Sequence, residues 1–285
     1  MSKNFESLYS DVPTEQRDAL RAFRENYAHH TLDVADTTWT YTTAGSGEKT
    51  ILWLVGGLKR ADAAYKSVPL MTDDYAIIAP DYPAVGSMDA LADGLAAILD
   101  AQNIEQAYVL SGSFGGMLAQ IFLRRHPKRV AKIILSTTTA PVASGVERYA
   151  QLRDMAKVAP PELLAETAQS QMFSTIAPPY SEADFYRAYL KELYEHRLTK
   201  ADIVTIYEAI IDYMGRTFSD DDLAGWQGEM LIFNSDNDAT FGDSNQQALY
   251  ALYPDAQVHT FEGAGHSPGS TQREVFFQRT RAFFT

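Results

Sequence analysis

Short apolar runs alternate with helix-like segments along the first half of the chain. The run from Ile51 to Val55 contains only apolar residues, which is typical of a strand that is buried on both faces. An alternation of such strands with helices indicates a mostly parallel sheet that is covered by helices on both faces. The sequence therefore predicts an α/β fold. We expect strands at 30–34, 38–43, 51–55, 75–79, 107–110, 131–135, 230–233 and 257–261, and helices at 15–27, 88–101, 117–125 and 272–284.

The segment from 142 to 228 shows no strand pattern, and its apolar residues recur at helical spacing instead. We therefore expect residues 1–141 and 229–285 to form one core, and residues 142–228 to form a helical cap over the carboxyl-terminal edge of the sheet. The alternative is that this segment forms a separate helical domain. Its two clearest helical stripes are Phe185, Tyr189, Leu190 and Leu193, and Ile203, Ile206, Tyr207, Ile210 and Met214.

Two pairs of residues in this segment have the spacing of a capping box at a helix start. Ser181 precedes Asp184, and Thr199 precedes Asp202, by the required three positions. In a capping box each of the two side chains accepts a hydrogen bond from the backbone N–H of the other residue. We therefore expect a helix to begin at each of these places.

The composition excludes several kinds of function. The chain has 24 Lys and Arg residues against 37 Asp and Glu residues, and its net charge of −13 disfavours binding to nucleic acid or to anionic lipid. The chain has no cysteine, which rules out disulfides, thiolate metal sites and a cysteine nucleophile. No metal-ligand spacing, phosphate loop or dinucleotide fingerprint occurs, so we expect neither a metal nor a cofactor.

The sequence also bears on the compartment. The N-terminal residues contain no apolar core of signal-peptide length, and no stretch approaches the ~20 apolar residues that span a bilayer. We therefore expect a cytoplasmic protein without a membrane span. The sequence leaves the oligomeric state open.

A turn of small residues follows the expected strand at 107–110 and leads straight into a helix. Such a sharp turn strains the backbone of its central residue, so the residues two positions away on either side must be small. Ser111 and Gly115 meet this requirement around Ser113, and Gly116 allows the helix to pack closely. This context favours a nucleophile elbow with Ser113 as the nucleophile. The alternative is an ordinary glycine-rich turn.

A serine hydroxyl is a weak nucleophile unless a base takes its proton and a third group orients that base. His266 is the candidate base, because it lies in the glycine-containing loop 262–268 directly after the last expected strand. A loop in this place can carry an imidazole to the strand ends where the serine turn lies. We expect the other histidines to be structural or solvated, namely His29, His30, His126, His196 and His259.

The orienting acid should follow another strand and precede the histidine in the chain. The loop after the strand at 230–233 offers Asp236 and Asp238. Asp238 is the better candidate, because it lies further into the loop, where the chain has left the sheet. Asp236 is the alternative acid, and we expect it to bind loop amides. In the remaining interpretation both residues only cap turns.

Acyl transfer also needs two backbone N–H donors for the oxyanion. The amide of Phe114, directly after the nucleophile, is one candidate. The other should come from the loop after the strand at 51–55, where Gly56 and Gly57 let the backbone approach a substrate. We choose the amide of Leu58 as the second donor and that of Gly57 as its alternative. A simple strand-terminating turn would explain the two glycines equally.

Together these residues resemble the α/β-hydrolase superfamily. The segments that carry the resemblance are LVGGL, APDYPAVG, SGSFGG, NSDNDATF and GAGHSP. The resemblance implies an eight-stranded, mainly parallel sheet with a helical cap inserted after the sixth strand. It also implies that Ser113 is the nucleophile, Asp238 the acid and His266 the general base.

Some features are more specific or depart from the superfamily pattern. Residues 81–122 look most similar to the maspardin-like branch, some of whose members have lost triad residues and act as binding proteins. Gly56-Gly57 stands where many members have His-Gly, and Ser111 stands where the elbow usually has glycine. No proline follows Asp238, where many members have one. None of these departures removes a catalytic group.

These observations favour a serine hydrolase that cleaves a small ester or a related acyl substrate through an acyl-enzyme. A serine elbow is also compatible with aminopeptidase, thioesterase, lactonase, carbon–carbon hydrolase, lyase and cofactor-free haloperoxidase chemistry, because a fold does not fix a reaction. The alternative of another class is a non-catalytic binding or adaptor protein. Residues 142–228 hold 14 acidic and 8 basic residues, so we expect a neutral or cationic small-molecule substrate.

Overall fold

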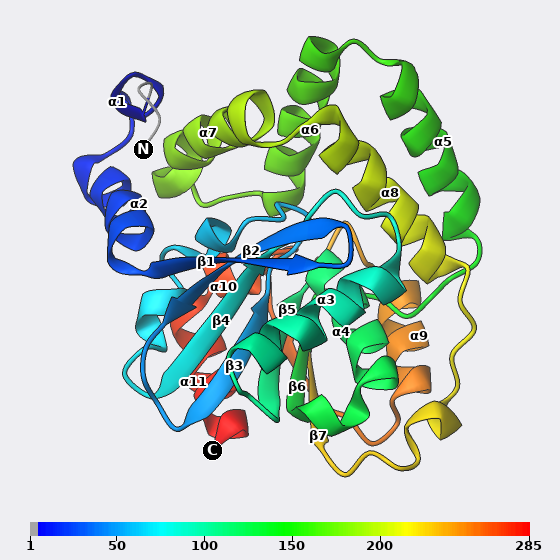
Figure 1. Ribbon diagram of the computed structural model, residues 1–285. Helices are drawn as coiled ribbons and strands as arrows, with labels where there is room; N and C mark the ends of the chain where they lie inside the picture. The colour runs from blue at the N-terminus through cyan, green and yellow to red at the C-terminus, as the bar shows by residue number, and fades with distance from the viewer. Residues whose placement is uncertain (1–4) are drawn as a thin grey trace.

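The computed structural model describes residues 5–285, apart from the side chain of Asp220, and has a single eight-stranded sheet at its centre (Figure 1). The strand order is β1-β2-β4-β3-β5-β6-β7-β8, and only β2 runs antiparallel to its neighbours. The predicted α/β fold and all its expected strands are therefore confirmed. The strands are β1 (Ala28–Val34), β2 (Thr37–Ala44), β3 (Lys49–Leu54), β4 (Tyr75–Asp81), β5 (Ala107–Gly112), β6 (Val130–Ser136), β7 (Glu229–Ser235) and β8 (Gln257–Phe261).

Helices cover both faces of the sheet. In Figure 1 helices α3 and α4 lie in front of the sheet and α11 lies behind it. The ring of Phe284 on α11 stacks on Tyr108 of β5 at 4.9 Å between centroids, so α11 closes the rear of the core. The helices outside the 142–228 segment are α1 (Phe5–Leu8), α2 (Thr14–Asn26), α3 (Met88–Ala101), α4 (Phe114–Arg125), α9 (Asp243–Leu252), α10 (Pro268–Thr271) and α11 (Arg273–Phe284), with short 3-10 turns η1 (Ala61–Ala64), η2 (Val68–Leu70) and η3 (Pro127–Arg129).

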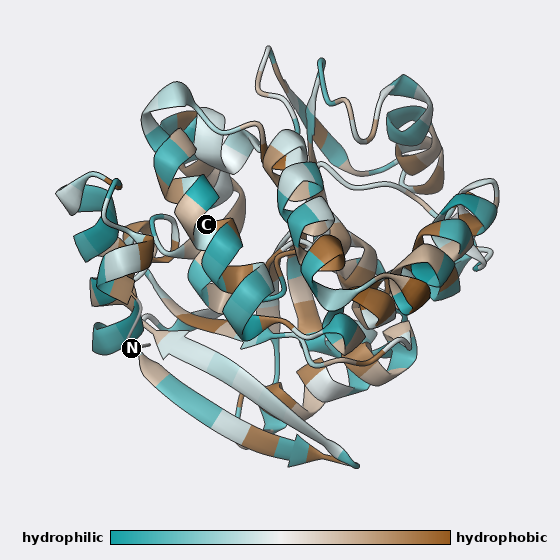
Figure 2. Cartoon of the chain, turned by 90° about the horizontal axis from the view of Figure 1, so that it is seen from above, coloured by the Kyte–Doolittle hydropathy of each residue, from teal (hydrophilic) through white to brown (hydrophobic). Residues whose placement is uncertain are grey.

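The segment between β6 and β7 is helical, as its apolar spacing predicted. It lies above the sheet in Figure 1, and Figure 2, seen from above, shows apolar and polar residues alternating along its helices. Its buried apolar side chains belong to the same cluster as those of the sheet, whereas Met155, Val158 and Leu163 are exposed. Its elements are α5 (Gly145–Val158), α6 (Pro161–Ile176), η4 (Tyr180–Glu182), α7 (Ala183–Glu192), the π-helical turn η5 (Leu193–Arg197), α8 (Lys200–Met214) and η6 (Asp220–Leu223).

The two expected capping boxes have different outcomes. Thr199 forms its box, because its side chain accepts from the N–H of Asp202 and the Asp202 carboxylate accepts from the N–H of Thr199. The prediction for Ser181 is wrong. Ser181 lies inside the 3-10 turn η4, so α7 begins two residues later without a side-chain cap. Asp184 pairs instead with Arg187 at 2.8 Å.

A buried ionic cluster fastens the N-terminal helices to the helical segment. The Arg24 guanidinium lies 2.8 Å from Asp62 and 2.9 Å from Glu192 at the end of α7. Arg197 lies 2.6 Å from the same Asp62 carboxylate, and the Tyr9 hydroxyl donates to Glu192 at 2.6 Å. Burial raises the pKa of Asp62, but the charges of Arg197 and Arg24 outweigh it and hold that pKa below its ordinary value. The helical segment is thus attached by ionised, mutually neutralising groups.

Residues 1–4, the start of the predicted core segment 1–141, lie outside the described residues.

Candidate active site

The candidate residues meet at one edge of the sheet. Strands β3, β5, β6, β7 and β8 are adjacent and parallel, so their carboxyl ends lie together. The predicted nucleophile follows β5, the candidate acids follow β7, the histidine follows β8 and the predicted oxyanion loop follows β3. In open α/β sheets this edge is where ligands bind.

The backbone of Ser113 has the strained geometry expected of an elbow. Its φ is 51° and its ψ is −120°, and helix α4 begins at the next residue. A Cβ on Gly115 would lie 2.3 Å from the carbonyl oxygen of Leu54, and one on Gly116 would lie 2.7 Å from the Cβ of Thr138. Both glycines are therefore required for α4 to approach the sheet so closely. This backbone geometry favours a nucleophile elbow over an ordinary turn.

Ser111, the departure from the usual glycine, has a structural role of its own. Its buried hydroxyl donates to the carbonyl oxygen of Ile134 on β6 at 2.7 Å. Because the serine side chain is small and its polar group is satisfied, it fits beside the elbow at little cost.

The three predicted triad residues form one hydrogen-bonded chain. Nε2 of His266 lies 2.9 Å from Oγ of Ser113, and Nδ1 lies 2.9 Å from Oδ2 and 3.0 Å from Oδ1 of Asp238. The side chains of His266 and Asp238 are only 8% and 1% exposed. The imidazole therefore connects a hydroxyl to a buried carboxylate, which is the arrangement that activates a serine.

The structure distinguishes the two candidate acids. Oδ1 of Asp238 also accepts the backbone N–H groups of Thr240 at 2.8 Å and Phe241 at 3.2 Å, which hold the carboxylate in place. Asp236 makes no contact with His266 and accepts the N–H of Gly263 at 2.7 Å, as expected of a residue that binds loop amides.

Asp236 belongs to a set of three consecutive side chains that hold the histidine loop. Ser235, Asp236 and Asn237, which we call the loop clamp, accept hydrogen bonds from three consecutive backbone N–H groups. Gly263, Ala264 and Gly265 donate to Asp236, Ser235 and Asn237 at 2.7, 3.1 and 2.7 Å, respectively. The clamp fixes the chain immediately before His266. Sequence reasoning missed Ser235 and Asn237, because their partners lie in a loop that is distant in the sequence.

The predicted oxyanion loop lies beside the nucleophile. A Cβ on Gly56 would lie 3.4 Å from the Cβ of Ser113, and the loop is closed by a hydrogen bond of 3.1 Å from the N–H of Lys59 to the Gly56 carbonyl. Leu58 lies within this turn. Phe114 is the first residue of α4, so its N–H has no acceptor within the helix. Both backbone segments thus lie beside Ser113, and the lining of the same cavity includes Leu58 and Phe114.

Gly57 faces the helical segment. A Cβ there would lie 3.4 Å from Cε of Met172 on α6 and 3.6 Å from Cδ1 of Ile206 on α8. The glycine therefore leaves room between the oxyanion loop and two helices that contribute to the same cavity.

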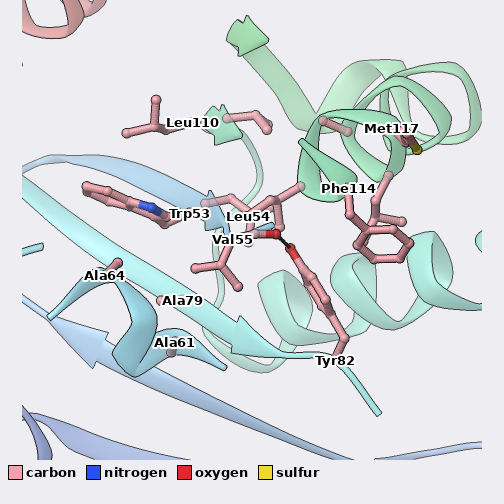
Figure 3. Packing of buried hydrophobic residues seen from close by; sticks show 14 of the residues in the cluster. Trp53, Leu54, Val55, Ala61, Ala64, Ala79, Tyr82, Leu110, Phe114 and Met117 are labelled. Carbon is pink, nitrogen blue, oxygen red and sulfur yellow. Dashed lines mark hydrogen bonds between the residues drawn. The ribbon is translucent and has the colours of Figure 1, made fainter. Parts of the chain in front are cut away.

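Tyr82, which sequence reasoning missed, braces the oxyanion loop from both ends. Its hydroxyl donates to the carbonyl of Val55 at 2.8 Å, and its backbone N–H donates to the carbonyl of Lys59 at 2.9 Å. Its ring lies against Phe114, with 5.6 Å between centroids (Figure 3). One buried side chain thus contacts the segments that carry both candidate oxyanion donors. The segment APDYPAVG drew attention to this region without assigning the role.

A buried ion pair joins the same loop to α8. Nζ of Lys59 donates to Oδ1 of Asp202 at 2.8 Å, and both side chains are less than 10% exposed. Burial raises the pKa of Asp202, but the hydrogen bond and charge of Lys59 with the capping contacts of Thr199 outweigh it, so that pKa lies below its ordinary value. Burial also lowers the pKa of Lys59, an effect that Asp202 offsets in part. We regard the pair as ionised, because three donors serve the Asp202 carboxylate.

A cavity of about 340 Å³ opens above Ser113 between the sheet and the helical segment. Its described lining is mainly apolar, and its ionisable side chains other than tyrosines are Lys59, Asp202 and His266. Because Lys59 and Asp202 bind each other, the lining presents no unpaired cation or anion. Tyrosines line the helical side, namely Tyr149, Tyr186, Tyr194 and Tyr207.

Residues 5–285 contain no group of three or more His, Asp or Glu side chains placed to hold a metal ion. Within the same residues, every helix is too short or too polar to cross a bilayer.

Comparisons with known proteins place this geometry in context. The family model described as "alpha/beta hydrolase fold" matches residues 49–270. The chain is 27% identical over 133 residues to the 2-hydroxy-6-oxo-6-phenylhexa-2,4-dienoate hydrolase of Comamonas testosteroni, covering 42% of this chain and 46% of that protein. It is 33% identical over 84 residues to the 2-hydroxymuconate semialdehyde hydrolase of Pseudomonas putida, covering 25% and 30%. The alignments thus span less than half the length of these relatives.

Among solved structures, a hydrolase from Pseudomonas aeruginosa aligns with a TM-score of 0.74 at 18% identity, over 91% of this chain and 98% of that one. This likeness concerns the fold. The more specific resemblance to the maspardin-like branch stays a prediction.

Proposed function

The chain belongs to the α/β-hydrolase family, and we propose that it is a serine hydrolase that cleaves a small neutral acyl compound, in the first place an ester, through an acyl-enzyme. The observation that carries the proposal is the hydrogen-bonded chain from Ser113 through His266 to Asp238 at the end of an apolar cavity. A binding protein would have no need of a strained serine in contact with a carboxylate-oriented imidazole.

The proposed mechanism follows from the positions of these groups. Oγ of Ser113 attacks the acyl carbon while Nε2 of His266 takes its proton, and Asp238 stabilises the resulting imidazolium. The imidazolium then protonates the leaving group. In the second half of the reaction a water molecule gives its proton to His266 and attacks the acyl-enzyme. This step releases the acid and restores the serine.

The backbone amides of Phe114 and Leu58 are the proposed oxyanion donors, with Gly57 as the alternative to Leu58. Loss of one such donor typically costs ~3 to 4 kcal/mol of transition-state stabilisation. Tyr82 supports this role, because it holds the carbonyls on either side of the loop and leaves the loop amides free to face the substrate.

Residues 142–228 are proposed to act as a cap on the core formed by 1–141 and 229–285. Side chains of α5, α6 and α8 line the cavity, so a substrate between them and Ser113 is shielded from bulk water. Exclusion of water strengthens the electrostatic interactions of the site.

The charge balance of the cavity supports a neutral substrate. The expectation of neutral or cationic substrates rested on the acidic excess of 142–228, but the acidic residue that lines the cavity, Asp202, is already bound to Lys59. A cation would therefore find no free carboxylate there. An anion would find no free cation.

Carbon–carbon hydrolysis is a second candidate, favoured by the partial similarity to the Comamonas testosteroni enzyme. The name of that enzyme's substrate denotes a carboxylate, and a carboxylate in this cavity would have to displace Lys59 from Asp202. This consideration places ester hydrolysis first.

The proposal can be tested with a fluorophosphonate probe, which forms a covalent adduct only with an activated serine. We expect a single adduct on Ser113 of the wild-type chain and none on Ser113→Ala, with p-nitrophenyl esters turned over only by the former. Assays of the Comamonas enzyme's substrate on the same samples test the second candidate. Folded wild-type protein that takes up no probe and cleaves no substrate would favour the non-catalytic alternative.

A further inference from the structure

Three tyrosine hydroxyls of the cavity lining have no hydrogen-bond partner among residues 5–285. They belong to Tyr149 on α5, Tyr194 on η5 and Tyr207 on α8, and all three residues line the cavity that contains Ser113. The fourth tyrosine of the lining, Tyr186, differs because its hydroxyl lies 3.4 Å from Oγ of Ser270. The three unpartnered hydroxyls therefore form a distinct set, which we call the phenol set.

The members of the phenol set lie near one another. The rings of Tyr149 and Tyr207 are 6.5 Å apart between centroids. Burial raises the pKa of each of the three hydroxyls, and the neighbouring phenol raises it further for Tyr194 and Tyr207. All three are therefore neutral hydrogen-bond donors at physiological pH.

An unpartnered hydroxyl in such a place requires an explanation. Buried polar groups in proteins are normally hydrogen-bonded, and leaving one without a partner is unfavourable. Tyr194 is only 8% exposed and lines the cavity, and its hydroxyl keeps some accessible surface, whereas Tyr149 and Tyr207 are half-buried. A phenylalanine would supply the same apolar surface without an unsatisfied donor.

We propose that Tyr149, Tyr194 and Tyr207 bind a neutral oxygen atom, such as a ketone oxygen, on the acyl chain of the substrate. The proposal rests on the proposed function, because it takes Ser113 as the attachment point of that chain. A neutral acceptor fits better than a carboxylate, since Lys59, the one lysine or arginine among the lining residues that the structure describes, is held by Asp202. The phenols can donate to an oxygen but supply no positive charge.

The test uses p-nitrophenyl esters whose acyl chains carry a ketone at successive positions, each paired with the ester that has methylene there. We expect at least one ketone position to raise kcat/KM relative to its methylene partner. Changing the phenol set to phenylalanine one residue at a time should lower this ratio by roughly 2- to 10-fold for each hydroxyl that contacts the ketone. Each variant's own turnover of the methylene ester is the reference for this ratio.

Tyr186→Phe is the matched control, because it removes a hydroxyl from the same lining whose partner is within the protein. It should leave the ketone-to-methylene ratio near its wild-type value. Equal ratios for wild type and the triple phenylalanine variant at every ketone position would overturn the proposal.

A binding measurement separates this proposal from the hydrolase assignment. Ser113→Ala protein, titrated calorimetrically with the best ketone ester and its methylene partner, should prefer the ketone, and the triple phenylalanine change should abolish that preference. If wild-type protein cleaves no ester but this preference is found, the hydrolase assignment fails and the phenol site stands. If esters are cleaved and no preference is found, only the phenol site fails.

Discussion

The two walls of the cavity differ in how their polar groups are satisfied. On the catalytic wall, formed by the carboxyl ends of the strands, Ser113, His266 and Asp238 are bound to one another, and the loop clamp holds the chain before the histidine. On the cap wall, formed by α5 to α8, the phenol hydroxyls have no partner among the described residues. The polar groups of the catalytic wall thus bind one another, whereas the three hydroxyls of the cap wall have no partner among residues 5–285.

The difference follows from the chemistry proposed for each wall. Catalytic groups must be held in productive geometry before the substrate arrives, because reorganisation during the reaction costs rate. Groups that select a substrate discriminate best when they form their hydrogen bonds only in the complex. An analogue that lacks the matching atom then leaves them unpaired. In these proposals the hydrogen-bonded groups of the catalytic wall and the unpartnered hydroxyls of the cap wall have complementary roles.

The largest expected effect concerns the acid of the catalytic wall. Asp238→Asn should lower kcat by about 10,000-fold, because an amide cannot hold the imidazole in the required tautomer. Asp236→Asn, the matched control two residues away, should cost less than about 10-fold, since an amide oxygen can still accept the N–H of Gly263. Steady-state rates with a p-nitrophenyl ester measure both. Equal losses in the two variants would contradict the assignment of Asp238.

The catalytic wall could largely be predicted from the sequence, and this has a physical reason. Each of its groups follows a strand within a few residues, and parallel strands carry such groups to one edge whatever the distant contacts are. The sequence predicted in this way that Ser113, Asp238 and His266 lie together, and they are hydrogen-bonded to one another. The strands could be predicted from local apolar patterns alone, because a strand that is buried on both faces is a continuous run of apolar residues.

The rest depended on contacts that no local pattern encodes. The partner of Lys59 lies 143 positions away, so the sequence indicated Asp202 only as a capping residue. Tyr82 looked like an ordinary residue after a strand, and Ser181 gave a capping signal that the 3-10 turn η4 overrode. The phenol set comes from three separate elements, and helical periodicity alone does not distinguish a tyrosine that faces a cavity from one that is packed in the core.

The second prediction concerns the ion pair that connects the two walls. Lys59→Met should destabilise the protein by about 3 to 5 kcal/mol, because it removes the hydrogen-bonded cation of the buried Asp202 carboxylate and leaves only Arg60, at 3.8 Å, in its place. The double variant Lys59→Met/Asp202→Leu should recover part of that loss, since neither charge of the pair is then left buried alone, while Arg60 loses its contact of 3.8 Å with Asp202 and Thr199 loses its capping partner. Urea unfolding measures all three proteins. A double variant as unstable as Lys59→Met would show that the pair acts through something other than charge.

The same pair predicts a pH dependence. The pKa of Asp202 is lowered in the folded protein, so its contribution to stability is present above the ordinary aspartate pKa and is lost as the pH falls through the lowered value. We expect the unfolding free energy of Asp202→Asn to fall less steeply with acid than that of the wild type. Urea titrations from neutral pH to the onset of acid unfolding measure the slopes, and parallel curves would contradict the prediction.

A smaller effect is expected from the brace of the oxyanion loop. Tyr82→Phe keeps the ring against Phe114 but leaves the buried carbonyl of Val55 without its donor, which should cost about 1 to 3 kcal/mol of stability. If the brace positions the Leu58 amide, kcat should fall several-fold while KM stays nearly constant, because the oxyanion exists only after attack. A purely structural role would lower stability and leave kcat per folded molecule unchanged.

The smallest effect should come from the cap wall and tests whether the two walls are independent. Thr199→Ala removes the hydroxyl of the capping box and should lower the unfolding free energy by about 1 kcal/mol. Thr199→Ser should restore most of it. Because Lys59 still holds Asp202 in this variant, the oxyanion loop should keep its position, and kcat for a plain ester should change by less than about 2-fold. A larger loss of kcat, recovered in Thr199→Ser, would mean that the start of α8 sets the geometry of the catalytic wall and that the walls act as one unit.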